Sequence, residues 1–88
     1  MKLSCKVKVK NSLGLHARPA TMIVKMLQET KSSVFFTYHR EKINAKSIMS
    51  ILMLAAGKNS EIKIDVEGDD AQEILDKLTL AFDQGFGE

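Results

Sequence analysis

The residues of this 88-residue chain that are best suited to chemistry are a histidine and an arginine two positions apart. His16 comes directly after Gly14-Leu15, and Arg18 directly precedes Pro19. Because proline fits only the first turn of a helix, a helix is expected to begin near residue 17 or 18, with His16 at its start. The first backbone N–H groups of a helix have no intrahelical partner and attract anions.

These surroundings suit His16 to accept and hold a phosphoryl group. Positive neighbours disfavour the imidazolium form, so a neutral, nucleophilic nitrogen is available near neutral pH. Arg18 and the helix N-terminus would then stabilise a dianionic group attached to the ring, which a partner protein could accept in turn. The alternative is a helix-capping or loop histidine beside a solvated arginine, and the spacing alone leaves both interpretations open.

Ser47 is a second candidate, because it precedes a short helix that is apolar on nearly every side. Its hydroxyl is by default a helix cap, but a phosphate at this position would be tolerated by the helix dipole. Ile48, Met49 and Leu52 share a side of this helix that is distinct from the side facing the core. That side is either a docking patch or covered by a loop, and we favour docking.

The elements that position these residues follow from the spacing of apolar side chains. Alternation and β-branched residues predict strands over residues 3–9, 33–38, 42–45 and 62–66. Helical spacing predicts helices over residues 17–30, 47–55 and 71–82. Strands with one polar face indicate an antiparallel sheet with helices on one side, in the order β-α-β-β-α-β-α. We therefore expect one α+β domain over residues 1–88.

Three local expectations concern turns and helix faces. Asp69 and Gln72 resemble a capping box at the start of the last helix. The connection around His39-Arg40 contains no glycine, so we expect a longer or bulged turn rather than a tight one. Met22 and Met26 lie opposite the core stripe of their helix, where they could extend the docking patch.

Composition and charge exclude several classes of protein. Residues 1–46 hold ten Lys/Arg and two Asp/Glu, while residues 47–88 hold three and nine, so the net charge is only +2. This weak charge, without interleaved aromatic residues, argues against a nucleic-acid partner. No apolar run approaches the ~20 residues of a membrane span. The single Cys5 and two distant histidines offer no disulfide or metal site, and nothing indicates a cofactor.

Two motifs, with the length and element order, resemble the histidine-containing phosphocarrier proteins, HPr, of the bacterial phosphoenolpyruvate-dependent sugar phosphotransferase system. They are Gly14-Leu15-His16-Ala17-Arg18-Pro19-Ala20 and Lys46-Ser47-Ile48-Met49. The resemblance implies the open-faced β-sandwich of that family, four antiparallel strands in the order 1-4-2-3 with three helices on one face. The lone Cys5 makes a reducing cytoplasm the expected compartment, and so small a chain, without an acid/base pair, is expected to be a monomeric carrier rather than an enzyme.

The resemblance further implies a role for each site residue. Enzyme I, charged by phosphoenolpyruvate, would phosphorylate His16 on Nδ1, and the group would pass to a IIA protein. Arg18 would neutralise and orient the phosphoryl group. Ser47 aligns with the serine that a dedicated HPr kinase/phosphorylase modifies in many bacteria, which impairs transfer and supports complexes with a transcriptional regulator. Partner contacts are expected at Thr21, Met22, Lys25, Ile48, Met49 and Leu52.

Some residues depart from the usual family pattern. His39-Arg40 stands where the family often has Asn-Gly, and Ala55 stands where many members have glycine. Residues 54–57 and the ending 85–88 also resemble the nitrogen-related branch, NPr. The sequence therefore leaves open whether the chain serves sugar uptake or nitrogen and potassium regulation, although Lys46-Ser47 favours a kinase-regulated HPr.

Overall fold

The sheet is built from four antiparallel strands whose order in space differs from their order in the sequence. In the computed structural model, which describes residues 1–88, the strands are β1 (Lys2–Lys8), β2 (Ser33–Tyr38), β3 (Glu41–Asn44) and β4 (Glu61–Glu67). They lie in the order β1-β4-β2-β3, and every pairing is antiparallel. The predicted strand order 1-4-2-3 is confirmed.

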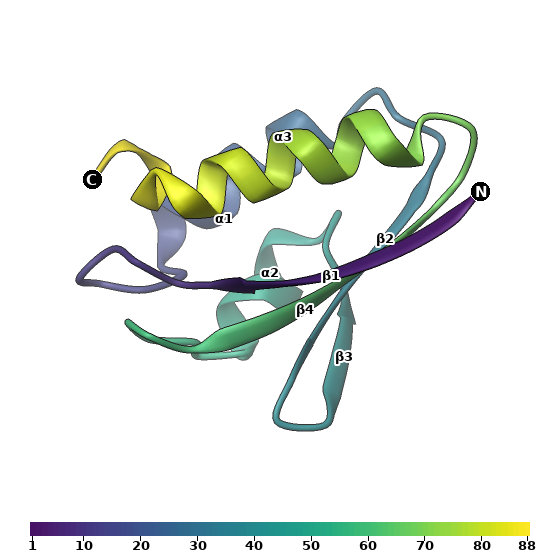
Figure 1. Ribbon diagram of the computed structural model, residues 1–88. Helices are drawn as coiled ribbons and strands as arrows, with labels where there is room; N and C mark the ends of the chain where they lie inside the picture. Colours follow the sequence, from purple (N-terminus) through teal and green to yellow (C-terminus); the bar gives the residue numbers. More distant parts are fainter.

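Three helices cover one face of this sheet. They are α1 (Ala17–Met26), α2 (Ile48–Met53) and α3 (Ala71–Asp83), and a short 3-10 turn, η1 (Gly85–Gly87), follows α3. Figure 1 shows α3 lying along the sheet, with the C-terminal end of the chain at the same end of the molecule as the β1–α1 connection. The longest helix has 13 residues, and no helix is long and apolar enough to cross a membrane.

Alternation along the strands separates the buried face of the sheet from the open face. Ile62, Ile64 and Val66 of β4 are fully buried, together with Phe36 of β2, whose ring packs edge-on against Phe82 of α3 at 5.8 Å between centroids. Burial of these side chains away from water is the main stabilising term of such a sheet.

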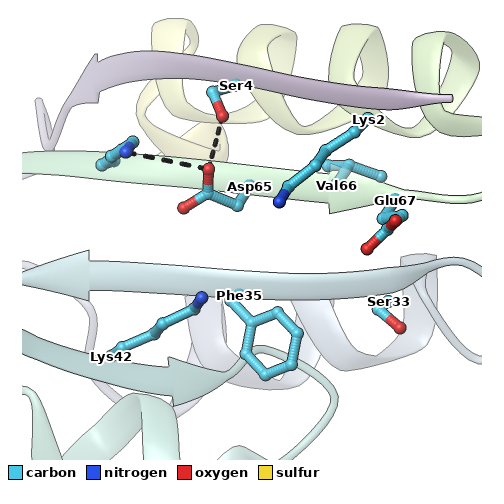
Figure 2. A pocket seen from close by; sticks show the side chains of 9 residues that line it. Lys2, Ser4, Ser33, Phe35, Lys42, Asp65, Val66 and Glu67 are labelled. Atoms are coloured by element: carbon cyan, nitrogen blue, oxygen red, sulfur yellow. Dashed lines mark hydrogen bonds and ion pairs between the residues drawn. The ribbon is translucent and has the colours of Figure 1, made fainter.

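The opposite face carries polar side chains and borders a shallow hollow. Figure 2 shows Ser4 of β1 pointing toward Asp65 of β4, to which its hydroxyl donates a hydrogen bond. Lys63 pairs with the same carboxylate at 3.9 Å, and the Lys42 ammonium lies 4.9 Å from the centre of the Phe35 ring. The lysines of the strands are thus exposed to solvent, and two of them, Lys6 and Lys63, pair locally with acidic side chains.

The β2–β3 connection corrects the expectation of a longer or bulged turn. Tyr38 pairs directly with Glu41, so the loop has only two residues. His39 and Arg40 both adopt positive φ, +48° and +69°, as a type I′ turn requires. The twist of the paired strands selects this turn, and these residues accept the left-handed conformation that glycine would adopt more easily.

The start of α3 corrects the predicted capping box. Asp70, rather than Asp69, is the N-cap residue, and its carboxylate makes no cap hydrogen bond. It instead accepts hydrogen bonds from the hydroxyls of Ser32 and Thr30, the latter at 2.6 Å. These bonds, that of Ser32 first, hold the pKa of Asp70 below its ordinary value. The carboxylate therefore ties the start of α3 to the segment that precedes β2.

Two helix ends also differ from the predictions. The α1 helix ends at Met26 and not at Thr30. The Leu27 N–H donates to the carbonyls of both Ile23 and Val24, which tightens the last turn. The α2 helix ends at Met53 and not at Ala55, which lies beyond it in the left-handed conformation with φ of +53°.

Candidate functional site

The loop that delivers His16 is fixed against the loop that follows α2. The Leu15 N–H donates to the Ala56 carbonyl at 2.9 Å. Gly14 adopts φ of +71°, and a Cβ at this position would collide with the Ala56 carbonyl oxygen and lie 2.7 Å from Gly57 Cα. Only glycine combines this conformation with so close an approach. Gly14 therefore fixes the position from which the chain enters α1.

His16 is the N-cap residue of α1, as the motif predicts, and it leaves the helix start open. Its side chain makes no cap hydrogen bond. The N–H groups of Ala17 and Arg18 have no acceptor in the protein, and Pro19, the third helical residue, has no N–H to offer. The helix start therefore presents unpaired donors and the positive end of the helix dipole directly beside the histidine.

The His16 ring is held at one nitrogen and free at the other. Its Nε2 lies 2.8 and 2.9 Å from the two carboxylate oxygens of Glu88. A carboxylate only accepts hydrogen bonds, so Nε2 bears the hydrogen, and Nδ1 of a neutral ring carries the lone pair. Nδ1 has no protein partner and is not among the fully buried polar atoms, while 32% of the side chain is exposed. The ring is thus accessible to a partner protein.

A buried asparagine holds the carboxylate in place. The Asn11 amide donates to the Gly14 carbonyl at 2.7 Å and to Glu88 Oε1 at 2.9 Å. The hydrogen bond from His16, followed by that from Asn11 and the nearby charges, outweighs burial and keeps the pKa of Glu88 below its ordinary value. Glu88 is therefore an ionised acceptor at neutral pH, joined to both the loop and the histidine.

Glu88 is the site residue that the sequence did not reveal, and it corrects the expectation of purely positive surroundings for His16. The two residues are 72 positions apart, so no local motif connects them. The buried ring of Phe86 anchors the C-terminal segment against Phe82 at 4.9 Å between centroids. Positive φ at Gly85 and Gly87 turns the chain back toward α1. The ending Gly85-Phe86-Gly87-Glu88 was the only available signal.

Arg18 lies beside this pair, as the motif predicts. Its Nε is 3.9 Å from Glu88 Oε2, and 73% of its side chain is exposed. This weak, solvated contact leaves the guanidinium free to turn toward an incoming anion. The three residues His16, Arg18 and Glu88 can therefore supply a nucleophilic nitrogen, a mobile cation and a fixed carboxylate.

Ser47 is the N-cap residue of α2, and its side chain makes the bond that His16 omits. Ser47 Oγ accepts a hydrogen bond from the Ser50 N–H at 3.2 Å. The adjacent residues Ile48, Met49 and Leu52 are 40%, 67% and 36% exposed. No loop covers them, so the alternative of a covered face is wrong, and we call these three residues the α2 patch. Since α1 packs against α2, the patch lies on the helix next to that of His16.

The remaining predicted contact residues are divided among different surroundings. Thr21 is half-buried, and its hydroxyl donates to the Ala17 carbonyl at 2.8 Å within α1. Met22 and Lys25 line a groove between α1 and α3, not the α2 patch. Met26 is packed against the core, so the expectation that it lies free opposite the core stripe is wrong. No group of three His, Cys, Asp or Glu side chains in the structure could hold a metal ion.

Comparisons with known proteins agree with the geometry. The family model described as "PTS HPr component phosphorylation site" matches residues 3–84. The phosphocarrier protein HPr of Chlamydia pneumoniae is 49% identical over 80 residues, which cover 91% of this chain and 74% of that protein.

Solved structures give the same result. The crystal structure of HPr-C-His from Thermoanaerobacter tengcongensis has a TM-score of 0.93 and 35% identity, covering 98% of this chain and 97% of the other. The crystal structure of HPr from Bacillus anthracis has a TM-score of 0.87 and 37% identity, covering 92% and 96%. These names give no specific support to the nitrogen-related branch.

Proposed function

Because the chain belongs to the HPr family of phosphotransferase-system phosphocarriers, and is a carrier rather than an enzyme, we propose that His16 is its phosphoryl-carrying residue. Membership of this family implies enzyme I as the donor and IIA proteins as the acceptors. The observation that carries the proposal is the unpaired Nδ1 of His16 beside the open start of α1.

When His16 Nδ1 attacks the phosphorus atom, the groups around the ring stabilise the charges that develop. As the Nδ1–phosphorus bond forms and the bond to the donor histidine or other leaving group on enzyme I breaks, positive charge develops on the imidazole. Glu88, bonded to Nε2–H at 2.8 Å, stabilises that charge and keeps the ring oriented without taking the proton. Transfer to a IIA protein runs through the same arrangement in reverse.

The transferred group gains its stabilisation from the other side of the site. Its oxygens are dianionic, and the free N–H groups of Ala17 and Arg18 lie at the positive end of α1. The exposed guanidinium of Arg18 adds a fork of donors that matches phosphate oxygens. Electrostatic stabilisation of this kind is commonly the largest catalytic contribution of a protein site.

The test is phosphorylation by enzyme I and phosphoenolpyruvate, in wild type and in two histidine variants. We expect wild type and His39→Ala to acquire an acid-labile phosphate, and His16→Ala to acquire none. His39 is the matched control because it lies in the β2–β3 turn, far along the chain from α1. An acid-labile phosphate acquired by the His16→Ala variant, or a stable phosphoserine as the only product of wild type, would contradict the proposal.

A second role is proposed for Ser47, as a regulatory phosphorylation site for an HPr kinase/phosphorylase. Ser47 begins α2, and the exposed α2 patch follows it directly. A phosphate there would add about two negative charges beside the apolar surface on which phosphoryl-transfer partners are expected to dock. The modified surface would disfavour those partners and suit a regulatory protein such as a transcriptional regulator.

A charge-mimicking variant tests this role. We expect Ser47→Asp to slow phosphoryl transfer from enzyme I to His16 by about tenfold or more, since a like charge at an interface costs binding free energy. Ser33→Asp adds the same charge to the open face of the sheet and should leave the transfer rate unchanged. Equal rates for wild type and Ser47→Asp would remove the support for regulation through this serine.

We further propose that the carrier acts as a cytoplasmic monomer. The lone Cys5 has no disulfide partner, as is usual in a reducing compartment. Size-exclusion chromatography with light scattering would test the monomer directly, and a concentration-independent mass near 9.8 kDa is expected.

A further inference from the structure

Asn11 differs from the other buried residues because it keeps a polar atom without a partner. Its side chain is 4% exposed, and its Oδ1 is the one buried side-chain oxygen or nitrogen in the structure that makes no hydrogen bond. A buried acceptor without a donor costs free energy, so its presence calls for an explanation. The explanation lies at the other end of the same amide, which makes two hydrogen bonds.

The two partners of this amide determine which of its ends faces them. The Gly14 carbonyl, at 2.7 Å, and Glu88 Oε1, at 2.9 Å, are both acceptors, so only the NH₂ end of the amide can satisfy them. Turning the amide over would place Oδ1 against a carbonyl oxygen and a carboxylate. Asn11 therefore acts here as a double donor, and its own acceptor is left unpaired as a result.

The β1–α1 loop does not need the Asn11 side chain to keep its shape. Backbone hydrogen bonds already close it, because the Gly14 N–H donates to the Asn11 carbonyl at 3.2 Å and the His16 N–H donates to the Gly14 carbonyl at 2.9 Å. The Gly14 carbonyl thus keeps a donor even when the side chain of Asn11 is removed. What the side chain adds is a link to Glu88, whose own side chain is only 15% exposed.

We propose that Asn11 is a positioning residue for phosphoryl transfer, which acts through Glu88 and does not touch the phosphoryl group. This inference rests on the function proposed for His16. Asn11 holds the Glu88 carboxylate against Nε2, so the ring keeps its hydrogen there and presents the lone pair of Nδ1. Without Asn11, the carboxylate loses its anchor on the loop and can turn together with the ring. The site tolerates a buried unpaired acceptor because this amide orients the histidine.

Replacement of Asn11 by an apolar residue of similar branched shape tests the role in transfer. Asn11→Leu removes two hydrogen bonds but also the unpaired acceptor, so the variant should remain folded. Transfer from phosphorylated enzyme I to His16 should slow by about threefold to tenfold, the usual effect of one lost hydrogen bond. Asn11→Ala cannot overpack the site, and it should slow transfer by a similar factor if leucine is not accommodated.

A double-mutant cycle with Glu88→Ala shows whether Asn11 acts through the carboxylate. In a chain that already lacks this carboxylate, Asn11→Leu should cause no further loss of transfer rate, since both changes break the same link. A residue that only shapes the loop would slow transfer by the same factor in both backgrounds.

A second measurement needs no phosphate. The hydrogen bond from Asn11 contributes to the lowered pKa of Glu88, so this pKa should rise in Asn11→Leu, as followed by NMR of the side-chain carboxyl carbon. The pKa of Asp70 is lowered by Ser32 and Thr30 and should not move, which makes Asp70 the internal control.

Three results would overturn the proposal. They are transfer at the wild-type rate in both Asn11 variants, an equal loss with and without Glu88, and an unchanged pKa of Glu88 in Asn11→Leu. In each case wild type would still acquire an acid-labile phosphate from enzyme I. A failure of the phosphocarrier proposal would instead leave wild type itself unphosphorylated, so the two failures are distinguishable.

Discussion

The starts of α1 and α2 have the same backbone plan but opposite chemistry. His16 and Ser47 are both N-cap residues with extended backbone conformations. Ser47 Oγ accepts the N–H of Ser50, the third helical residue, at 3.2 Å. At the equivalent position of α1 stands Pro19, which has no N–H. The α2 start is therefore closed by its own cap, whereas the α1 start is left open.

The difference separates a structural use of a helix start from a chemical one. A capped start stabilises its helix but has one fewer donor to give to a ligand. The open start of α1 stabilises nothing by itself, and its 10 residues must rely on burial of Pro19, Ala20 and Ile23. Glu88 then approaches the histidine from the far end of the chain, and no carboxylate takes that place beside Ser47. The comparison predicts that loss of a functional side chain at the α1 start affects phosphoryl transfer, whereas loss of the Ser47 cap at the α2 start affects stability.

The largest effect is expected from removal of the cation at the open start. Arg18→Ala should slow phosphoryl transfer through His16 by roughly 10–100-fold, since a hydrogen bond to a charged group contributes about 1.5–3 kcal/mol. Rapid-quench measurement of phosphate transfer from phosphorylated enzyme I gives the rate. Arg40→Ala, in the β2–β3 turn, removes an exposed arginine elsewhere and is the control. Equal losses in both variants would indicate a general effect of net charge instead of a role for Arg18.

Much of this arrangement could be predicted from local sequence patterns. Alternation in β1 and β4, the apolar stripe of α1, and the position of Pro19 are all set by neighbouring residues. They predict His16 and Arg18 at a helix start, and they predict Ile48, Met49 and Leu52 on one side distinct from the core face, although a covering loop stayed an alternative. The exposed side follows from helix geometry, because Ile51 and Leu54 take the buried face.

The features that sequence patterns missed depend on contacts between distant residues. Glu88 reaches His16 only because Phe86 is buried and the flanking glycines turn the chain. The Asp70 carboxylate does not cap α3, because it accepts hydrogen bonds from the hydroxyls of Thr30 and Ser32, which lie within reach only in the folded chain. The tight turn at His39-Arg40 is imposed by the register and twist of β2 and β3, which override the local preference for glycine.

A smaller effect, on stability, is expected from removal of the α2 cap. Ser47→Ala should lower the free energy of unfolding by about 1 kcal/mol, the usual value of an N-cap serine. For a domain of this size, that corresponds to a melting temperature lower by roughly 4–8 °C. Ser50→Ala keeps the backbone N–H, and the Ser50 hydroxyl makes no hydrogen bond, so this variant should unfold close to wild type. A melting temperature unchanged in Ser47→Ala would mean that the α2 start needs no cap.

The smallest effect is a change in the titration of one carboxyl group at the open start. Hydrogen bonding from His16 is the first cause that holds the pKa of Glu88 below its ordinary value of 4.5. The carboxylate is therefore more than half ionised at pH 4.5 in wild type, and its pair with Nε2 is lost as the pH falls through the lowered pKa of Glu88. In His16→Ala this cause is absent, so the pKa of Glu88 should rise toward 4.5, as followed by NMR of the side-chain carboxyl carbon. Asp70 is the internal control, because its lowered pKa is caused by Ser32 and Thr30 and should not change. If the midpoint of Glu88 stayed unchanged in His16→Ala, the carboxylate would not be held by the histidine, and the difference between the two helix starts would reduce to the presence or absence of a cap.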